Sequence, residues 1–264
     1  MRSGDTGGCP LVAGAPSEVA AIVVGAALAG FVQGLSGFAY SLVAMSVWAW
    51  ALPPQVAAPL TVFGALIGQF LSLASFRRGF ELRILAPLIV GGALGVPIGV
   101  FILHNIDARG FKAVVGGALI LYALVGLGAG AMPRVKGGGA GADAAAGLIG
   151  GVFGGLGGMS GAAPAAWAIL RGWRAEARRA AMQAYNIAMH VLTLIIYWRT
   201  HALDLTPWTL YAIVAPTMLF PAFLGARAAA RLSEAATKRV LFLLLFAAGV
   251  ALILGAAGLA GKGR

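Results

Sequence analysis

Two glycine-rich interruptions stand at matching places in two long apolar stretches, and they constrain the fold more than any other feature of the sequence. The first reads GFVQGLSGFAYSL over residues 30–42, and the second reads GVFGGLGGMSGAA over residues 151–163. Residues 34–38 align with residues 155–159. Apolar helices that are broken at corresponding positions of two halves indicate the binding site of a transporter. We therefore interpret the breaks as the tips of two half-membrane hairpins that face each other.

The composition places the chain in a bilayer. Of its 264 residues 60% are hydrophobic and only 10% are charged, and the mean hydropathy is +0.92. Soluble domains carry about a quarter charged residues. The sequence therefore predicts a polytopic helical membrane protein with one domain in the lipid. The net charge of +11 lies in loops between apolar runs, so membrane topology explains it and we expect no nucleic-acid partner.

The length of the first broken segment favours a hairpin. As one straight helix, residues 18–50 would extend about 50 Å, against a hydrocarbon core of about 30 Å. Divided into two full spans, the same residues would give pieces that are too short to cross. A re-entrant hairpin that turns at residues 34–37 satisfies both constraints.

The remaining segments repeat one plan. Residues 1–16 are expected to form a disordered tail, residues 17–132 a first repeat, residues 133–142 a linker, and residues 143–260 a second repeat. The expected spans are residues 55–76, 82–103, 107–131, 175–198, 207–226 and 233–259. The predicted fold is all-α: two inverted repeats, each with a glycine-rich broken hairpin and three transmembrane helices.

The distribution of basic residues supports this layout. If each broken segment returns to the side it entered from, thirteen of the nineteen lysines and arginines lie on one side. If each is a single span, the division is nine against ten, which has no bias. Cytoplasmic loops are enriched in lysine and arginine, so the first layout is preferred. Each half then crosses three times, and the two halves are inverted relative to each other.

The titratable residues do not suggest an enzyme. All eight acidic residues fall in the tail, in loops or at helix ends, and the three histidines are scattered. An intramembrane protease or a cation site would place carboxylates or metal ligands within the membrane. We expect no metal, no cofactor and, without a nucleotide-binding motif, no ATP drive.

A small anion could be held by the breaks themselves. A half-helix that starts after Gly37 or after Gly158 would present free backbone N–H groups and the positive end of its dipole. Gln33, Ser36 and Ser160 add neutral donors, while His190 is the one ionisable residue deep in a span and could carry a proton. The residues expected to bind substrate are Gln33, Gly34, Ser36, Gly37, Phe38, Gln69, Gly155, Gly157, Gly158, Met159, Ser160, Asn186 and His190.

A structural alternative competes with each of these assignments. The glycines could serve only close helix packing, as the glycines between residues 91 and 99 are expected to do. Gln69 and Gln183 could make neutral hydrogen bonds between helices. The arginines from Arg171 to Arg179 are interpreted as a cytoplasmic retention cluster that could also attract anions to an entrance.

At these motifs the chain resembles the TauE/SafE family of sulfite exporters, also described as sulfonate permeases. The resemblance rests on GFVQGLSGFAYSLVA, on GGVFGGLGG with the following Gly161 and Pro164, and on the two-repeat length. It implies transport of sulfite, sulfonates or other small sulfur-containing anions across the bacterial inner membrane. Two further hypotheses stand beside it: an exporter of amino acids or other small zwitterions, and a non-transporting membrane assembly subunit.

The expected activity is thus secondary transport of a small sulfur-containing anion by alternating access. The sequence leaves open whether transport is coupled to protons, to sodium or to neither. It leaves open equally whether the chain forms homo-oligomers.

Overall fold

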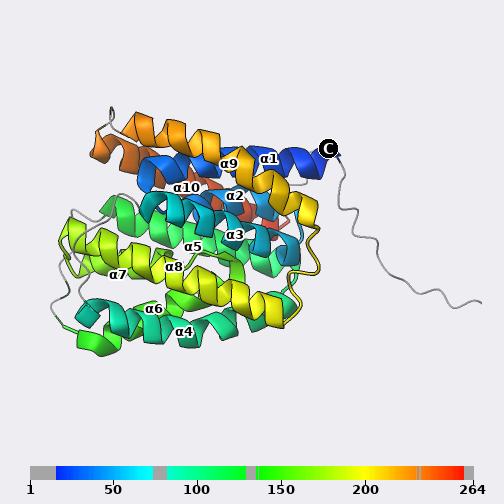
Figure 1. Ribbon diagram of the computed structural model, residues 1–264. Coiled ribbons are helices and arrows are strands. Elements are labelled where there is room, and N and C mark those ends of the chain that lie inside the picture. Colours follow the sequence, from blue (N-terminus) through cyan, green and yellow to red (C-terminus); the bar gives the residue numbers. More distant parts are fainter. Residues whose placement is uncertain are drawn as a thin grey trace, which may run out of the picture.

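The computed structural model describes residues 16–73, 82–128, 135, 137–229, 231 and 233–258. Within these residues all regular secondary structure is helical (Figure 1). The ten helices are α1 Pro16–Ser36, α2 Tyr40–Ala51, α3 Pro54–Leu73, α4 Leu82–Asn105, α5 Ala108–Gly128, α6 Gly139–Gly157, α7 Ala162–Leu170, α8 Ala175–Arg199, α9 Trp208–Ala229 and α10 Glu234–Ala256. The expected tail, apart from Pro16, and the basic residues Arg77, Arg78, Arg134 and Lys136 lie outside the described residues.

The hydropathy pattern places the helices correctly. Eight of the ten described helices are long and apolar enough to cross a membrane, so the prediction of an all-helical polytopic protein is confirmed. Asp107 caps α5 as its position predicts, because its Oδ1 accepts the Gly110 N–H at 2.9 Å. Several boundaries differ by a few residues; in particular, α6 begins at Gly139, so the last residues of the expected linker are helical.

Each broken segment divides into one long and one short helix. The 21 residues of α1 extend about 31 Å, which is enough to cross the hydrocarbon core, and the 19 residues of α6 extend about 28 Å. The expectation that both pieces of the first broken segment would be too short to cross is therefore wrong for α1. This helix continues to Ser36, the last residue before Gly37, and α6 likewise continues to Gly157, the last residue before Gly158. The 12 residues of α2 and the 9 residues of α7 are too short to cross.

Each short helix folds back along the long helix before it. Trp48, near the end of α2, donates its Nε1–H to the carbonyl of Ala21, near the start of α1, at 3.1 Å. In the second half Trp167 of α7 donates its Nε1–H to Oδ1 of Asp143, near the start of α6, at 2.7 Å. The end of each short helix therefore lies beside the beginning of its long partner.

A glycine seam joins α4 to α6. Every fourth residue on the contacting face of α4 is glycine, and a Cβ atom there would collide with a backbone carbonyl of α6. The colliding pairs are Gly91 with Ala144, Gly95 with Leu148 and Gly99 with Val152. Glycines on α6 meet α4 in the same way, so the two backbones are in direct contact and the helices run parallel. Small residues at such an interface permit this close approach.

A second seam joins α1 to α9. A Cβ atom at Gly30 or Gly34 would meet the carbonyl of Met218 or Ala222, and one at Gly225 would meet the carbonyl of Phe31. These helices are also parallel. Both seams connect a helix of the first half to a helix of the second half, so the two halves are interleaved rather than packed as separate bundles (Figure 1).

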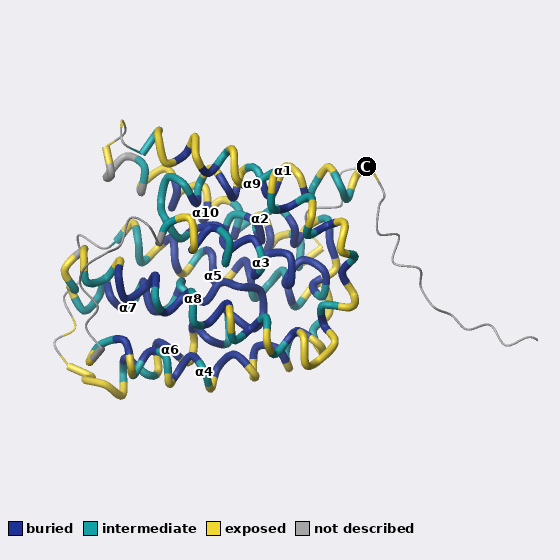
Figure 2. The backbone as a smooth tube through the Cα atoms, viewed as in Figure 1, coloured by how far each residue is buried: buried dark blue, intermediate teal, exposed yellow. Residues whose placement is uncertain are grey.

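The buried residues concentrate in the interior around α3, α8 and the two breaks, while the outer faces of the peripheral helices are exposed (Figure 2). Large apolar side chains cover those faces: Phe101 is 70% exposed and Phe220 is 69% exposed. Trp198 and Trp208, at the turn between α8 and α9, are 70% and 85% exposed. Aromatic side chains of this kind are enriched at the membrane–water interface.

Candidate functional site

The two breaks share one backbone conformation. Gly37 has φ +83° and Gly158 has φ +73°, both in the left-handed region that favours glycine. Their N–H groups donate to the carbonyls of Gln33 and Gly154, each at 2.7 Å, which closes the last turn of α1 and of α6. The sequence alignment pairs these two glycines, and the structure gives them equivalent roles as left-handed caps.

The amides of the first break are bonded within the break. The Oγ of Ser36 accepts the N–H groups of Phe38 and Ala39 at 3.4 and 3.2 Å. The Oε1 of Gln33 accepts the N–H of Tyr40 at 3.1 Å. The first N–H groups of a helix lack partners within it, and nearby hydroxyl and amide side chains supply them. These three amides are therefore not free, in contrast to the expectation for the start of the half-helix.

Gln33 fixes the shape of the first break. It is 2% exposed, and its Nε2 donates to the carbonyl of Gly37 at 3.0 Å and to Oγ of Ser72 at 3.3 Å. With its Oε1 on Tyr40, the side chain spans the break and ties it to α3. Gln33 lines neither of the two cavities described below.

A buried polar network holds the second break against α8. Ser160 Oγ donates to Oδ1 of Asn186 at 3.0 Å and lies 3.4 Å from Nε2 of His190. The same Nε2 lies 2.9 Å from the carbonyl of Gly158, so we assign the proton to Nε2. His190 is 2% exposed, and its Nδ1 has no hydrogen-bond partner among the described residues. The three predicted residues Ser160, Asn186 and His190 thus lie together at the second break.

Other predicted site residues serve packing. A Cβ at Gly34 would meet the carbonyl of Ala222, and one at Gly155 would meet that of Val96. Gly157 faces the methyl group of Met45. Gln69 contributes its backbone carbonyl, which accepts Nε2 of Gln183 at 2.6 Å. Of these four predicted residues, namely Gly34, Gly155, Gly157 and Gln69, none lines a cavity described here.

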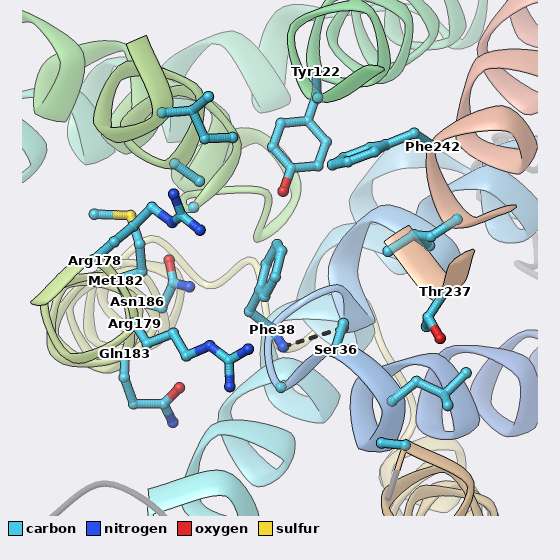
Figure 3. Close-up of a pocket in the computed structure, with 18 residues that line it drawn as sticks. Ser36, Phe38, Tyr122, Arg178, Arg179, Met182, Gln183, Asn186, Thr237 and Phe242 are labelled. Atoms are coloured by element: carbon cyan, nitrogen blue, oxygen red, sulfur yellow. Dashed lines mark hydrogen bonds between the residues drawn. The ribbon is translucent and has the colours of Figure 1, made fainter. Parts of the chain in front are cut away.

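A cavity of about 410 Å³ opens beside the first break (Figure 3). We call it the vestibule. It lies where α5, α7 and α9 end and where α8 and α10 begin. Its walls are mostly apolar, with a few polar groups directed inward. They are Leu35, Ser36, Gly37, Phe38, Tyr122, Gly126, Gly161, Ala165, Ile169, Arg178, Arg179, Met182, Gln183, Asn186, Ala229, Thr237, Leu241 and Phe242.

Two arginines give the vestibule its charge. The side chains of Arg178 and Arg179 extend from α8 toward the tip of the first break (Figure 3). None of the described residues that line the vestibule is acidic. Guanidinium groups bind oxyanions through paired N–H donors and remain charged at all physiological pH values. The arrangement can therefore bind and orient a negatively charged ligand.

These arginines are not among the residues predicted to bind substrate, although their cluster was expected to be able to attract anions to an entrance, and the sequence holds a further signal. Arg178, Met182, Asn186 and His190 follow one another at intervals of four residues on α8. Residues at this spacing lie on one face of a helix. The face of α8 that carries Asn186 and His190 therefore continues back to Arg178, and this periodicity could have identified Arg178.

A much smaller cavity of about 10 Å³ lies at the second break. We call it the inner chamber. Predicted residues Gly158, Met159, Asn186 and His190 line it together with Phe38. The remaining lining residues are Ser41, Leu42, Gly161 and Ala162. Phe38, Gly161 and Asn186 line both cavities, so the two spaces share a wall.

The fold and this site define a polytopic helical membrane protein with a cationic cavity between its two halves. The family model for the sulfite exporter TauE/SafE matches residues 22–252, which is most of the chain. The protein belongs to the TauE/SafE family, and the resemblance noted in the sequence is confirmed. No curated protein and no solved structure matches the chain.

Proposed function

We propose that the protein is a secondary transporter that moves a small sulfur-containing anion, namely sulfite, a sulfonate or a related organosulfur oxyanion, across the bacterial inner membrane. One observation carries the proposal: the vestibule, inside a membrane-spanning helical bundle, is lined by Arg178 and Arg179. Both arginines stand at the start of α8, Arg178 half-buried and Arg179 exposed, where their charge can attract an oxyanion to the cavity. Membership of the TauE/SafE family supports the class of cargo.

The proposed contacts combine charge with directed neutral groups. The two guanidinium groups attract and orient the oxyanion, while Ser36, Gln183 and Asn186 add polar edges to the same wall. Both breaks, through Phe38 and Gly158, form the inner end of the pathway. A compact oxyanion has several acceptor oxygens and can use all of these groups at once.

We propose that the two halves are inverted repeats with re-entrant hairpins. If each helix is replaced by its counterpart in the other half, α1 and α9 become α6 and α4, so the two seams correspond. Within each seam the two helices run parallel. The folding back of α2 on α1 and of α7 on α6 supports a return of each broken segment to its starting side. Between the broken segments, α3, α4 and α5 would provide the three crossings that invert the second half.

Alternating access in this arrangement moves interleaved bodies. Because the seams fix α1 to α9 and α6 to α4 through backbone contacts, each body contains helices from both halves. Movement of one intact half against the other would break both seams. We therefore assign the motion to the α1–α9 body relative to the α4–α6 body, because the breaks that follow α1 and α6 both line the inner chamber.

The decisive experiment is anion flux into proteoliposomes. Radiolabelled sulfite is expected to accumulate, and unlabelled sulfonates are expected to compete, whereas alanine and glycine should not. An amino-acid exporter would need a partner for the ammonium group, and no described residue of the vestibule is acidic. Imposed proton and sodium gradients identify the coupling ion. Flux that equals that of protein-free liposomes would overturn transport and favour an assembly subunit.

Topology labelling tests the re-entrant hairpin. In a Cys9→Ala background, single cysteines at Glu18 and at Pro53 are expected to react with an impermeant thiol reagent from the same side of the membrane. Both positions flank the first broken segment. A cysteine at Arg227, near the end of α9, should react only from the other side. Labelling of Glu18→Cys and Pro53→Cys from opposite sides would contradict the re-entrant hairpin and the inverted arrangement of the two halves.

A further inference from the structure

Phe38 stands between the vestibule and the inner chamber. Three residues line both cavities, and of these Gly161 has no side chain and Asn186 is polar. The Phe38 side chain is the one large apolar group of the shared wall, and it points from the first break toward α5 (Figure 3). The Phe38 ring therefore separates the wide vestibule from the narrow inner chamber.

The sizes of the two spaces show what this separation does. The vestibule measures about 410 Å³ and the inner chamber about 10 Å³. A space of about 10–15 Å³ holds one water molecule. A sulfur oxyanion has at least four heavy atoms and does not fit the inner chamber as it stands. The polar groups that line the inner chamber alone, Ser41 and His190, are therefore closed to such an anion unless the shared wall moves.

The surroundings of Phe38 permit that movement. The preceding residue, Gly37, has open space where a Cβ would stand, with no atom within 4 Å. The aromatic partner of the Phe38 ring is Tyr122, in an edge-to-face contact at 6.4 Å between centroids, and Tyr122 in turn meets Phe242 at 5.5 Å. Such a contact contributes about 0.5–1.5 kcal/mol beyond area burial, so the ring is held without being locked.

We propose that Phe38 is a gate residue: an anion bound at the vestibule reaches the inner chamber only when the Phe38 ring leaves the shared wall. The two cavities then join, and the ligand gains the Ser41 hydroxyl and the His190 imidazole as neighbours. The inference rests on the proposed function for the identity of the cargo. Its test does not, because it measures access to the chamber without any transport.

A matched pair of cysteines on α7 measures that access. Ala162 lines only the inner chamber and Ala165, one turn later, lines only the vestibule. In a Cys9→Ala background, Ala162→Cys and Ala165→Cys are each reacted with 2-sulfonatoethyl methanethiosulfonate, on purified protein in lipid nanodiscs. With Phe38 in place, Ala165→Cys is expected to react at least about tenfold faster than Ala162→Cys, which corresponds to a modest barrier.

Variants at Phe38 then decide the proposal. Phe38→Ala should bring the rate at Ala162→Cys close to that at Ala165→Cys, while Phe38→Trp should keep it slow. Phe242→Ala is the matched control, because Phe242 lines the vestibule alone and should leave Ala162→Cys slow. An unchanged elution volume and an unchanged rate at Ala165→Cys verify the fold. If Phe38→Ala fails that check, Phe38→Leu takes its place.

Two outcomes overturn the gate. One is a rate at Ala162→Cys that stays slow when the ring is removed from a folded protein. The other is equal acceleration by Phe242→Ala or by Phe38→Trp, because the ring itself would then not be the barrier. Loss of anion flux with the labelling pattern intact would overturn the proposed function alone, so the two failures are distinguishable.

Discussion

Replacing both vestibule arginines, R178Q/R179Q, is expected to raise the KM for anion flux at least about 100-fold, with the protein still folded. A hydrogen bond to a charged group contributes about 1.5–3 kcal/mol, so the loss of two such partners weakens binding by about 3 kcal/mol or more. Glutamine keeps part of the aliphatic side chain and a neutral donor while it removes the charge. The measurement is initial flux against anion concentration in proteoliposomes.

The matched control is Arg174→Gln. Arg174 precedes α8, is exposed, and does not line the vestibule, although it belongs to the same basic cluster. Its replacement should change KM less than about threefold, because a surface charge acts only through screened attraction. Equal effects of R174Q and R178Q/R179Q would mean that the cluster serves topology alone and that the vestibule is not the binding site.

Enlarging Gly151 is expected to destabilise the protein more than any substitution in the vestibule. A Cβ at this position of α6 would collide with the carbonyl of Gly92 on α4, so the two backbones must separate. Overpacking of this kind costs about 1–3 kcal/mol for one added group, and more for a larger one. Gly151→Ala should lower the midpoint of thermal unfolding by several degrees, and Gly151→Leu should prevent recovery of folded protein.

Gly117 provides the control. It lies in the middle of α5, is exposed, and a Cβ there would meet no atom within 4 Å. Gly117→Ala and Gly117→Leu should therefore leave the melting temperature unchanged or raise it, since both residues favour helix over glycine. Fluorescence-detected size-exclusion chromatography after heating measures all four variants. A Gly151→Ala protein that melts with its parent would show that the seam is not tight.

The helices and the positions of the two breaks could be predicted from the sequence. Membrane helices leave a strong trace in hydropathy, and the left-handed caps at Gly37 and Gly158 require a residue that tolerates positive φ. Repetition of the pattern then distinguished these two glycines from others in the chain. Boundaries were less accurate where small residues continue a helix beyond its hydrophobic part, as at Gly139.

The roles of individual glycines could not be predicted. Gly34 and Gly155 belong to the same glycine-rich strings as Gly37 and Gly158, yet they contact α9 and α4 instead of a cavity. Small-residue faces look alike in sequence, and only the three-dimensional arrangement reveals which helix each one meets. The amide groups of the first break were misjudged for a related reason, because Ser36 turns back onto its own turn.

The vestibule arginines, near the beginning of a membrane helix, were interpreted as a cytoplasmic retention cluster that could also attract anions to an entrance. That position suits cytoplasmic retention, and retention does not exclude lining a cavity. The vestibule itself is formed by the first break, α5, α7, α8 and α10, which are distant in the sequence. The four-residue spacing within α8 therefore indicates that Arg178 and Asn186 share one face of this helix. It does not indicate which other helices that face lies against.

The interleaving of the halves also determines how the protein can assemble during synthesis. When α1 has entered the membrane, its seam partner α9 has not yet been translated, and α9 begins only at Trp208. The glycine face of α1 must therefore wait without its seam partner until about the last fifth of the chain is inserted. α6, in contrast, meets α4 soon after it leaves the ribosome. Nascent protein thus completes the α4–α6 seam early and the α1–α9 seam late.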